Sequence, residues 1–121
     1  MSGFKSNEDL VQAIFDGLRE ILKMTLLIRD LVLREEFERL PELLSRREVK
    51  ISEVGEILRE FENLRDRFLN FEQVKGEIIE LTEQILKIDQ ENADNIREKM
   101  KQISEELKEM IERKKLLRYF R

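Results

Sequence analysis

FERLPELLSRREVKISEVGEILREFENLRDRF, residues 37–68, carries the most regular apolar pattern in the chain. Along this stretch, mainly apolar residues recur at alternating steps of three and four positions, which is an unbroken a/d heptad repeat. A second set of apolar residues beside the first widens the apolar face of the helix. The a/d set is Phe37, Leu40, Leu44, Arg47, Ile51, Val54, Leu58, Phe61, Arg65 and Phe68, and the second set is Leu43, Ile57, Leu64 and Phe71. A face this wide favours a helical bundle over a two-stranded coil. Because Pro41 fits only within a first helical turn, we expect a helix over about 38–69.

A first helix is predicted over 7–33. Ser6 is a good N-cap, and Asp9 has the spacing of a capping box. The stretch from Ile21 to Leu33 contains nine apolar residues in thirteen, more than the single apolar stripe of a surface helix. Two interpretations follow: this is the central helix of a bundle, or part of it forms a groove for an amphipathic helix of a partner.

A third helix is predicted over 71–112, after a break near Asn70. Asn70 can cap this helix, with Gln73 at the reciprocal position and a hydrophobic staple between Leu69 and Val74. The apolar stripe has one extra four-residue step, a stutter that surrounds Asn92. Short connections between the three helices predict an all-α, antiparallel three-helix bundle with coiled-coil-like packing and a long C-terminal helix.

Three polar residues interrupt the apolar seams. Arg47 and Arg65 could extend their guanidinium groups to the edge of the bundle, or each could pair with a carboxylate and fix the helix register. Snorkelling is the preferred interpretation for Arg65, and the two remain equal for Arg47. Asn92 is either a register device or an exposed residue at the stutter.

Composition excludes most catalytic chemistry. The chain has no His and no Cys, so the common general base, the thiol nucleophile and the common zinc ligands are missing. The four glycines never cluster into a phosphate-binding loop. We therefore expect no enzyme, no cofactor and no metal. The longest uncharged run is six residues, so we also expect no membrane insertion and a cytoplasmic location.

The C-terminal segment, residues 113–121, differs in charge from the rest. Residues 1–112 carry 18 basic and 27 acidic residues, a net charge of −9, whereas RKKLLRYFR carries +5. Basic residues suit the C-terminal end of a helix dipole, but that role leaves the large apolar residues unexplained. We interpret the segment as a detachable recognition element. Its partner-binding candidates are Arg113, Lys114, Lys115, Leu116, Leu117, Arg118, Tyr119 and Phe120.

Three stretches together resemble the FliT/FlgN-type flagellar export chaperones. LLSRREVKISEV (43–54) is similar to their second helix, and ILKIDQEN (85–92) to a hydrophobic run that ends in an acidic, Asn-containing step. KKLLRYF (114–120) is similar to the basic ending that leads to a tyrosine. The resemblance extends from about Leu10 to Phe120. The sequence ends at Arg121, so we do not expect a regulatory role of the kind assigned to longer tails in the family.

The resemblance implies a small helical chaperone of the flagellar type III export system. Such proteins bind the amphipathic C-terminal helix of a late substrate, either the filament cap or a hook–filament junction protein, and deliver it to export-gate and ATPase components. By match, Tyr119 is the candidate contact to the export gate. The basic segment would either engage that gate or cover the cargo surface as a lid. The pattern of this chain itself places the cargo surface on the apolar parts of the second and third helices.

Two other classes compete with this interpretation. A self-associating structural coiled coil would satisfy its seam with its own copies, and a homodimer is compatible with either class. A nucleic-acid-binding regulator would use the basic segment, but a net charge of −9 on the remainder opposes binding to a polyanion. We expect no nucleic-acid partner.

Overall fold

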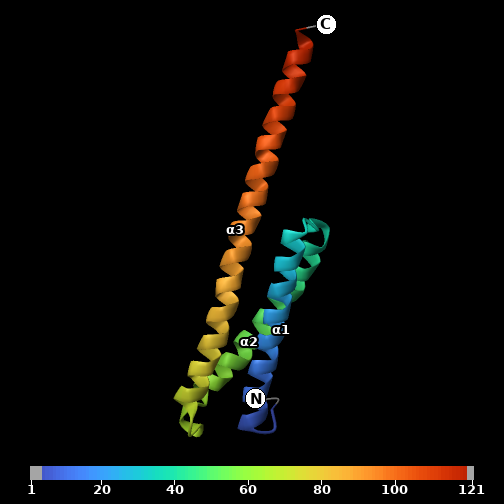
Figure 1. The fold of residues 1–121 in the computed structure, drawn as a ribbon. Helices are drawn as coiled ribbons and strands as arrows, with labels where there is room; N and C mark the ends of the chain where they lie inside the picture. Colours follow the sequence, from blue (N-terminus) through green and yellow to red (C-terminus); the bar gives the residue numbers. More distant parts are fainter. Residues whose placement is uncertain (1–3, 120–121) are drawn as a thin grey trace.

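A computed structural model describes residues 4–119 of the chain, except for the side chain of Leu117. The elements follow in the order α1 (Asn7–Leu33), a 3-10 turn η1 (Phe37–Arg39), α2 (Leu40–Asn63), a second 3-10 turn η2 (Arg65–Arg67) and α3 (Phe71–Arg118). Within the described residues there are three α-helices and no strand, which confirms the predicted all-α fold. Figure 1 shows α1 and α2 as a hairpin against the first half of α3, whose second half extends beyond them.

The start of α1 follows the predicted cap, and its end has an unusual residue. The backbone N–H of Asp9 donates to Ser6 Oγ at 3.1 Å. At the other end, Glu35 N–H donates to the Val32 carbonyl and Glu36 N–H to the Leu31 carbonyl. These two bonds form a Schellman motif, which needs a left-handed residue, and Glu35 has φ 60° where glycine is usual.

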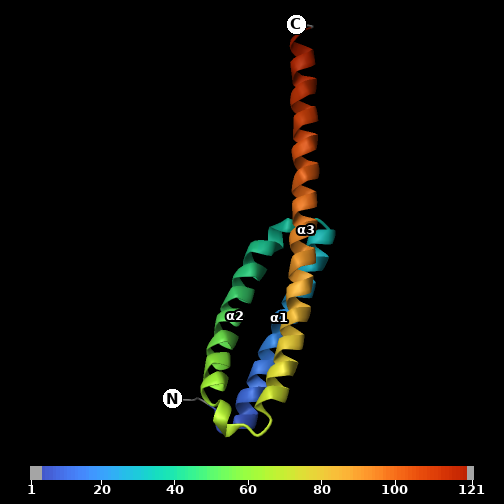
Figure 2. The same cartoon turned by 90° about the vertical axis from the view of Figure 1, so that its left-hand side faces the viewer.

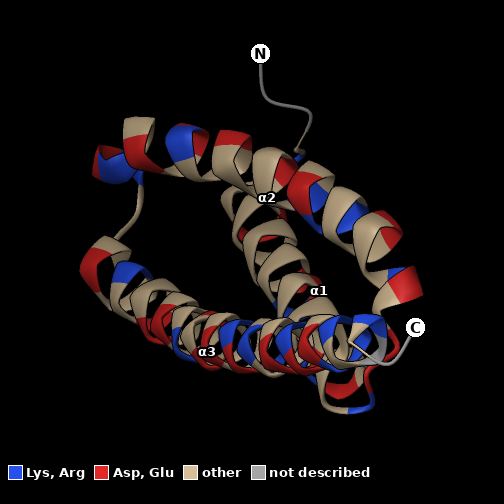
Figure 3. Ribbon diagram, turned by 90° about the horizontal axis from the view of Figure 1, so that it is seen from above, with Lys and Arg blue, Asp and Glu red and all other residues tan. Residues whose placement is uncertain are grey.

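The apolar richness of α1 is explained by its position between the other two helices. α1 packs against both α2 and α3, while α2 and α3 contact each other little (Figures 2 and 3). The most deeply buried side chains therefore lie on α1, namely Leu10, Ile14, Thr25, Leu31 and Val32. The interpretation of Ile21–Leu33 as the central helix is correct, although Leu27 and Leu33 are exposed.

The end of α2 corrects one prediction. α2 stops at Asn63 rather than near residue 69, because the chain must reverse before α3 can pack on α1. The reversal places Phe68 in extended backbone, with its ring centroid 4.9 Å from that of Phe61. Phe71 stacks on Phe61 with the ring centroids 4.6 Å apart, and it also lies 6.4 Å from Phe68. Burial of this aromatic cluster stabilises the break in the heptad.

The boundaries of α3 are partly as predicted. The helix begins at Phe71, and Val74 N–H donates to the carbonyl of Asn70. The predicted hydrophobic staple is wrong, because the Leu69 side chain is fully exposed. The helix continues to Arg118 instead of ending near 112, since Lys, Leu and Arg are good helix formers and nothing in the basic segment stops it. Its 48 residues span about 72 Å.

Candidate interaction surfaces

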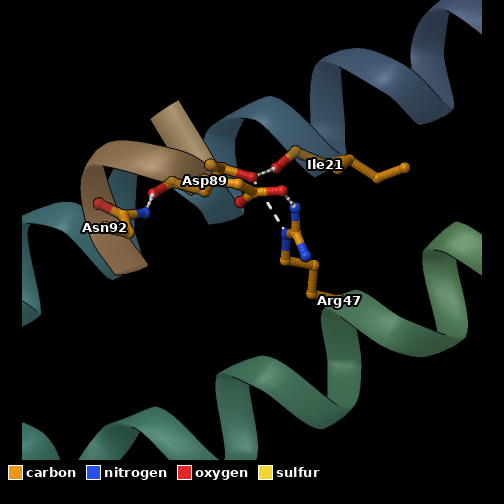
Figure 4. A network of polar contacts seen from close by, with 5 residues as sticks. Ile21, Arg47, Asp89 and Asn92 are labelled. Atoms are coloured by element: carbon orange, nitrogen blue, oxygen red, sulfur yellow. Dashed lines mark hydrogen bonds and ion pairs between the residues drawn. The ribbon is translucent and has the colours of Figure 1, made fainter. Parts of the chain in front are cut away.

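A polar network joins the three helices near the middle of the bundle (Figure 4). Arg47 Nη2 on α2 lies 2.6 Å from Asp89 Oδ2 on α3, and Arg47 Nε donates to Thr25 Oγ1 on α1 at 3.1 Å. Thr25 in turn donates its hydroxyl to the Ile21 carbonyl. The Arg47 side chain is only 13% exposed, so of its two interpretations the structure supports pairing with a carboxylate.

Asn92 extends this network and is not an exposed stutter residue. It is buried, and its Nδ2 donates to the backbone carbonyl of Thr25 at 3.2 Å. Its Oδ1 is buried without a hydrogen-bond partner among the described residues. A buried amide bonded to the neighbouring backbone fixes how far α3 can slide along α1, which is what a register device does.

Arg65 has no such role. It lies in η2 rather than on a continuous helical seam, and its side chain is about half exposed. Its guanidinium group lies 3.5 Å from a Glu72 carboxylate oxygen and 5.2 Å from the centroid of the Phe71 ring. These contacts resemble the preferred snorkelling interpretation, in which the charge stays in water while the stem covers an aromatic surface.

An apolar groove separates α2 from α3. Because both helices pack on α1 rather than on each other, a space of about 270 Å³ remains between them. α1 forms its floor, and the Arg47–Asp89 pair lies at its rim. Its lining residues are Leu18, Ile21, Arg47, Ile51, Val54, Gly55, Leu58, Thr82, Ile85, Leu86 and Asp89. The groove is mainly aliphatic and open on one side, so it can accept apolar side chains presented by another chain.

Space at the groove wall is increased by Gly55. A Cβ atom placed there would meet no atom within 4 Å. Leu86 on the opposite wall is more than half exposed. Ile51, which lines the same groove, is also exposed, and exposed apolar residues gathered at a concave surface mark an interaction site.

The basic C-terminal segment lies at the free end of α3. Arg113 through Arg118 are helical, and the charged residues among them are exposed. Tyr119 is 84% exposed, and its N–H closes the helix on the Leu116 carbonyl. Arg113 approaches Glu109 at 4.0 Å and Lys115 approaches Glu112 at 3.6 Å, both within the same helix. Phe120 lies outside the described residues.

Several of the remaining charged groups form surface pairs. Lys50 on α2 lies 3.0 Å from Glu53 and 3.2 Å from Glu20 on α1. Hydrogen bonds to Glu53 and Glu20 raise the pKa of Lys50 above its ordinary value. Within residues 4–119, no group of three or more acidic side chains is arranged to hold a metal ion. No helix in that range combines the length and hydropathy needed to cross a bilayer.

Sequence patterns identified only part of these surfaces. They located Arg47 and Asn92 but missed Asp89 and Thr25, the groups with which they interact. Asp89 follows the apolar residues of ILKIDQEN directly, and this position at the edge of a seam was the available signal. The apolar pattern indicated the two helices that carry the groove walls, but it did not indicate which residues line the groove.

Comparison with known proteins gave no further assignment: no family model, no curated protein and no solved structure matches this chain.

Proposed function

We propose that this chain is a flagellar type III export chaperone. It binds the amphipathic C-terminal helix of a late export substrate, the filament cap or a hook–filament junction protein, and delivers it to the export apparatus. In this proposal the protein acts in the cytoplasm, without catalysis, cofactor or metal.

The observation that carries the proposal is the open apolar groove between α2 and α3. Its walls are Ile51, Leu58 and Leu86, and they lie on the two helices where the sequence pattern placed the cargo surface. A cargo helix would insert a few aliphatic side chains between these walls while its polar face remained in water. Such binding protects an assembly helix that would otherwise associate prematurely.

The basic segment has a separate role in this proposal. Arg113–Arg118 and Tyr119 lie at the far end of α3, well away from the groove residues Thr82–Asp89. A tip with basic and aromatic side chains suits an acidic docking surface on the export gate. Cargo and gate could then be bound at the same time by one helix.

Calorimetric titration tests cargo binding. The full chain is titrated with C-terminal segments of the cap and junction proteins from the same organism, and one of them should bind. Leu86→Glu places a charge on the groove wall and should weaken binding by about tenfold or more. The matched control is Ile79→Glu, which changes an exposed apolar residue of the same helix outside the groove and should bind as the parent does.

Failure to bind either segment, with helical content intact, would overturn the cargo assignment. It would favour the alternative, a self-associating structural coiled coil without cargo. Equal loss in Leu86→Glu and Ile79→Glu would retain a cargo but remove it from the groove. A second assay measures retention of Tyr119→Ala by the cytoplasmic part of the export gate, where loss of retention without loss of cargo binding is expected.

A further inference from the structure

The free half of α3 presents an apolar stripe that nothing in the described chain covers. The last contact of α3 with the α1–α2 turn is the ion pair of Lys99 with Glu35, at 2.8 Å. We call residues 100–118 the arm, and Figures 1 and 2 show it alone beyond the bundle. Its stripe consists of four side chains that are 50–65% exposed: Met100, Ile103, Leu107 and Met110.

The spacing of this stripe is that of a coiled-coil seam. Its steps of three, four and three residues place all four side chains along one line of the helix, at a and d positions. Most helical stability in proteins comes from packing of the apolar face, and the stripe of the arm packs on nothing in the described chain. The arm therefore has the residue pattern expected of one of the two helices in a helix–helix interface.

We propose that the occupant of this stripe is the arm of a second copy of the chain, running antiparallel to the first. With a twofold axis between residues 108 and 109, Leu107 of each copy faces Met110 of the other. Ile103 then faces Lys114, whose aliphatic stem covers it while the ammonium group reaches water. The interface is isologous, so each of these contacts occurs twice.

Charge favours this direction over the parallel one. Glu106 and Arg113 each directly precede an a position, so they lie on the same flank of the stripe. When two helices run in opposite directions, this flank of one meets the same flank of the other, and each Glu106 faces an Arg113. A parallel pair would instead place Lys114 against Lys114 and bring Arg113 to Arg118, which repel.

Both residues are available for such a pair. The Glu106 side chain makes no ion pair or hydrogen bond within the described part of the chain. Arg113 has only the 4.0 Å approach to Glu109, and both of these side chains are more than 70% exposed. The same register brings the end of one arm level with Lys99 of the other, so the arms overlap over their whole free length and the two bundles lie at opposite ends.

The inference is independent of the proposed cargo site, but it shares Arg113 and Lys114 with the proposed gate contact, so a second arm and the gate would compete for these two residues. The groove is lined by residues of α3 only up to Asp89, before the arm begins. A dimer can therefore form whether or not cargo binds, and cargo binding can fail without affecting the mass of the free protein.

Sedimentation of the full chain tests the interface. The parent should sediment at twice its mass of 14.7 kDa and dissociate on dilution. Glu106→Arg and Arg113→Glu each make both cross-pairs repulsive and should weaken self-association about tenfold or more. The two variants mixed in equal amounts should restore a dimer, because each repulsive residue then faces an opposite charge. Helical content measured by circular dichroism controls for folding.

A parent that stays monomeric at every concentration at which it remains dissolved would overturn the proposal and give the stripe to a different protein. The antiparallel arrangement would be overturned if Arg113→Glu dimerised more tightly than the parent and gained no affinity when mixed with Glu106→Arg. Because the chain has no Cys, disulfides between introduced cysteines give an independent test of whether the two arms run parallel or antiparallel. Leu107→Cys mixed with Met110→Cys should form mainly the mixed disulfide, and disulfides within each variant would instead indicate parallel arms.

Discussion

Gly17 lies where α1 crosses α2, and replacing it with alanine should separate helix propensity from packing. Gly17 is buried, and Val54 on α2 is 3% exposed and packed directly against it. A Cβ atom at Gly17 would lie well inside van der Waals contact with Val54 Cγ2. The nearest atom after Cγ2 is Val54 Cβ, at 3.8 Å, which is an ordinary contact.

Two opposing effects set the size of the change. Alanine is favoured over glycine in a helix interior by about 1 kcal/mol. Forcing an extra methyl group into a well-packed crossing costs about 1–3 kcal/mol, and Val54 cannot move freely because the core surrounds it. We expect Gly17→Ala to lower the free energy of unfolding by up to about 2 kcal/mol.

Urea unfolding followed by circular dichroism measures this change, and the chain supplies its own controls. A Cβ at Gly55 or at Gly76 meets no atom within 4 Å, so alanine there should stabilise the protein by about 0.5–1 kcal/mol. In the double variant Gly17→Ala/Val54→Ala the obstructing methyl groups are gone. Its loss should be smaller than the sum of the two single losses by about 1 kcal/mol. If Gly17→Ala is as stable as Gly55→Ala, the close crossing of α1 and α2 is not real.

Three further outcomes are expected. In a double-mutant cycle with Arg47→Met and Asp89→Asn, urea unfolding should give a coupling free energy of about 1–2 kcal/mol, because the ion pair is partly buried. A coupling free energy near zero would mean that the pair is only a surface contact. Glu35→Gly should raise the free energy of unfolding by about 0.5 kcal/mol, because it relieves about 1 kcal/mol of left-handed backbone strain and loses only the exposed ion pair with Lys99. A lower free energy of unfolding would mean that this ion pair stabilises the fold by more than the strain costs. The raised pKa of Lys50 stabilises the fold below pH 10.5, and this contribution is lost as the pH rises through the pKa of the folded state. The free energies of unfolding of the parent and of Lys50→Met should therefore converge at alkaline pH. A difference that stays constant with pH would contradict the assignment.

Local signals in the sequence predicted the beginnings of the helices well. Ser6 caps α1, Pro41 lies in the first turn of α2, and α3 begins at Phe71, because caps and proline act within a few residues. The end of α2 could not be read in this way. The heptad continues through Arg65 and Phe68, and the helix nevertheless ends because packing of three phenylalanine rings outweighs the local pattern.

The candidate surfaces were less predictable for a similar reason. A groove depends on how far α2 and α3 diverge over α1, which no spacing along one helix encodes. Many acidic residues could have paired with Arg47, so Asp89 was visible only once the helices were placed. The continuation of α3 to Arg118 is different, since the segment contains no Gly or Pro to stop the helix and its helicity was readable.

Because α3 is one continuous helix from the groove to its C-terminal end, a small tilt of the helix gives a larger displacement at that end. Asp89, Asn92 and Lys99 tie one part of α3 to its neighbours, and Arg118 at the end of the helix lies about 28 Å past Lys99 at 1.5 Å of rise per residue. A rotation of α3 by about 10° about Lys99 would displace that end by about 5 Å. In a chain whose arm is not paired with a second copy, a tilt of α3 that widens or narrows the groove would therefore displace the basic tip further than it displaces the groove wall.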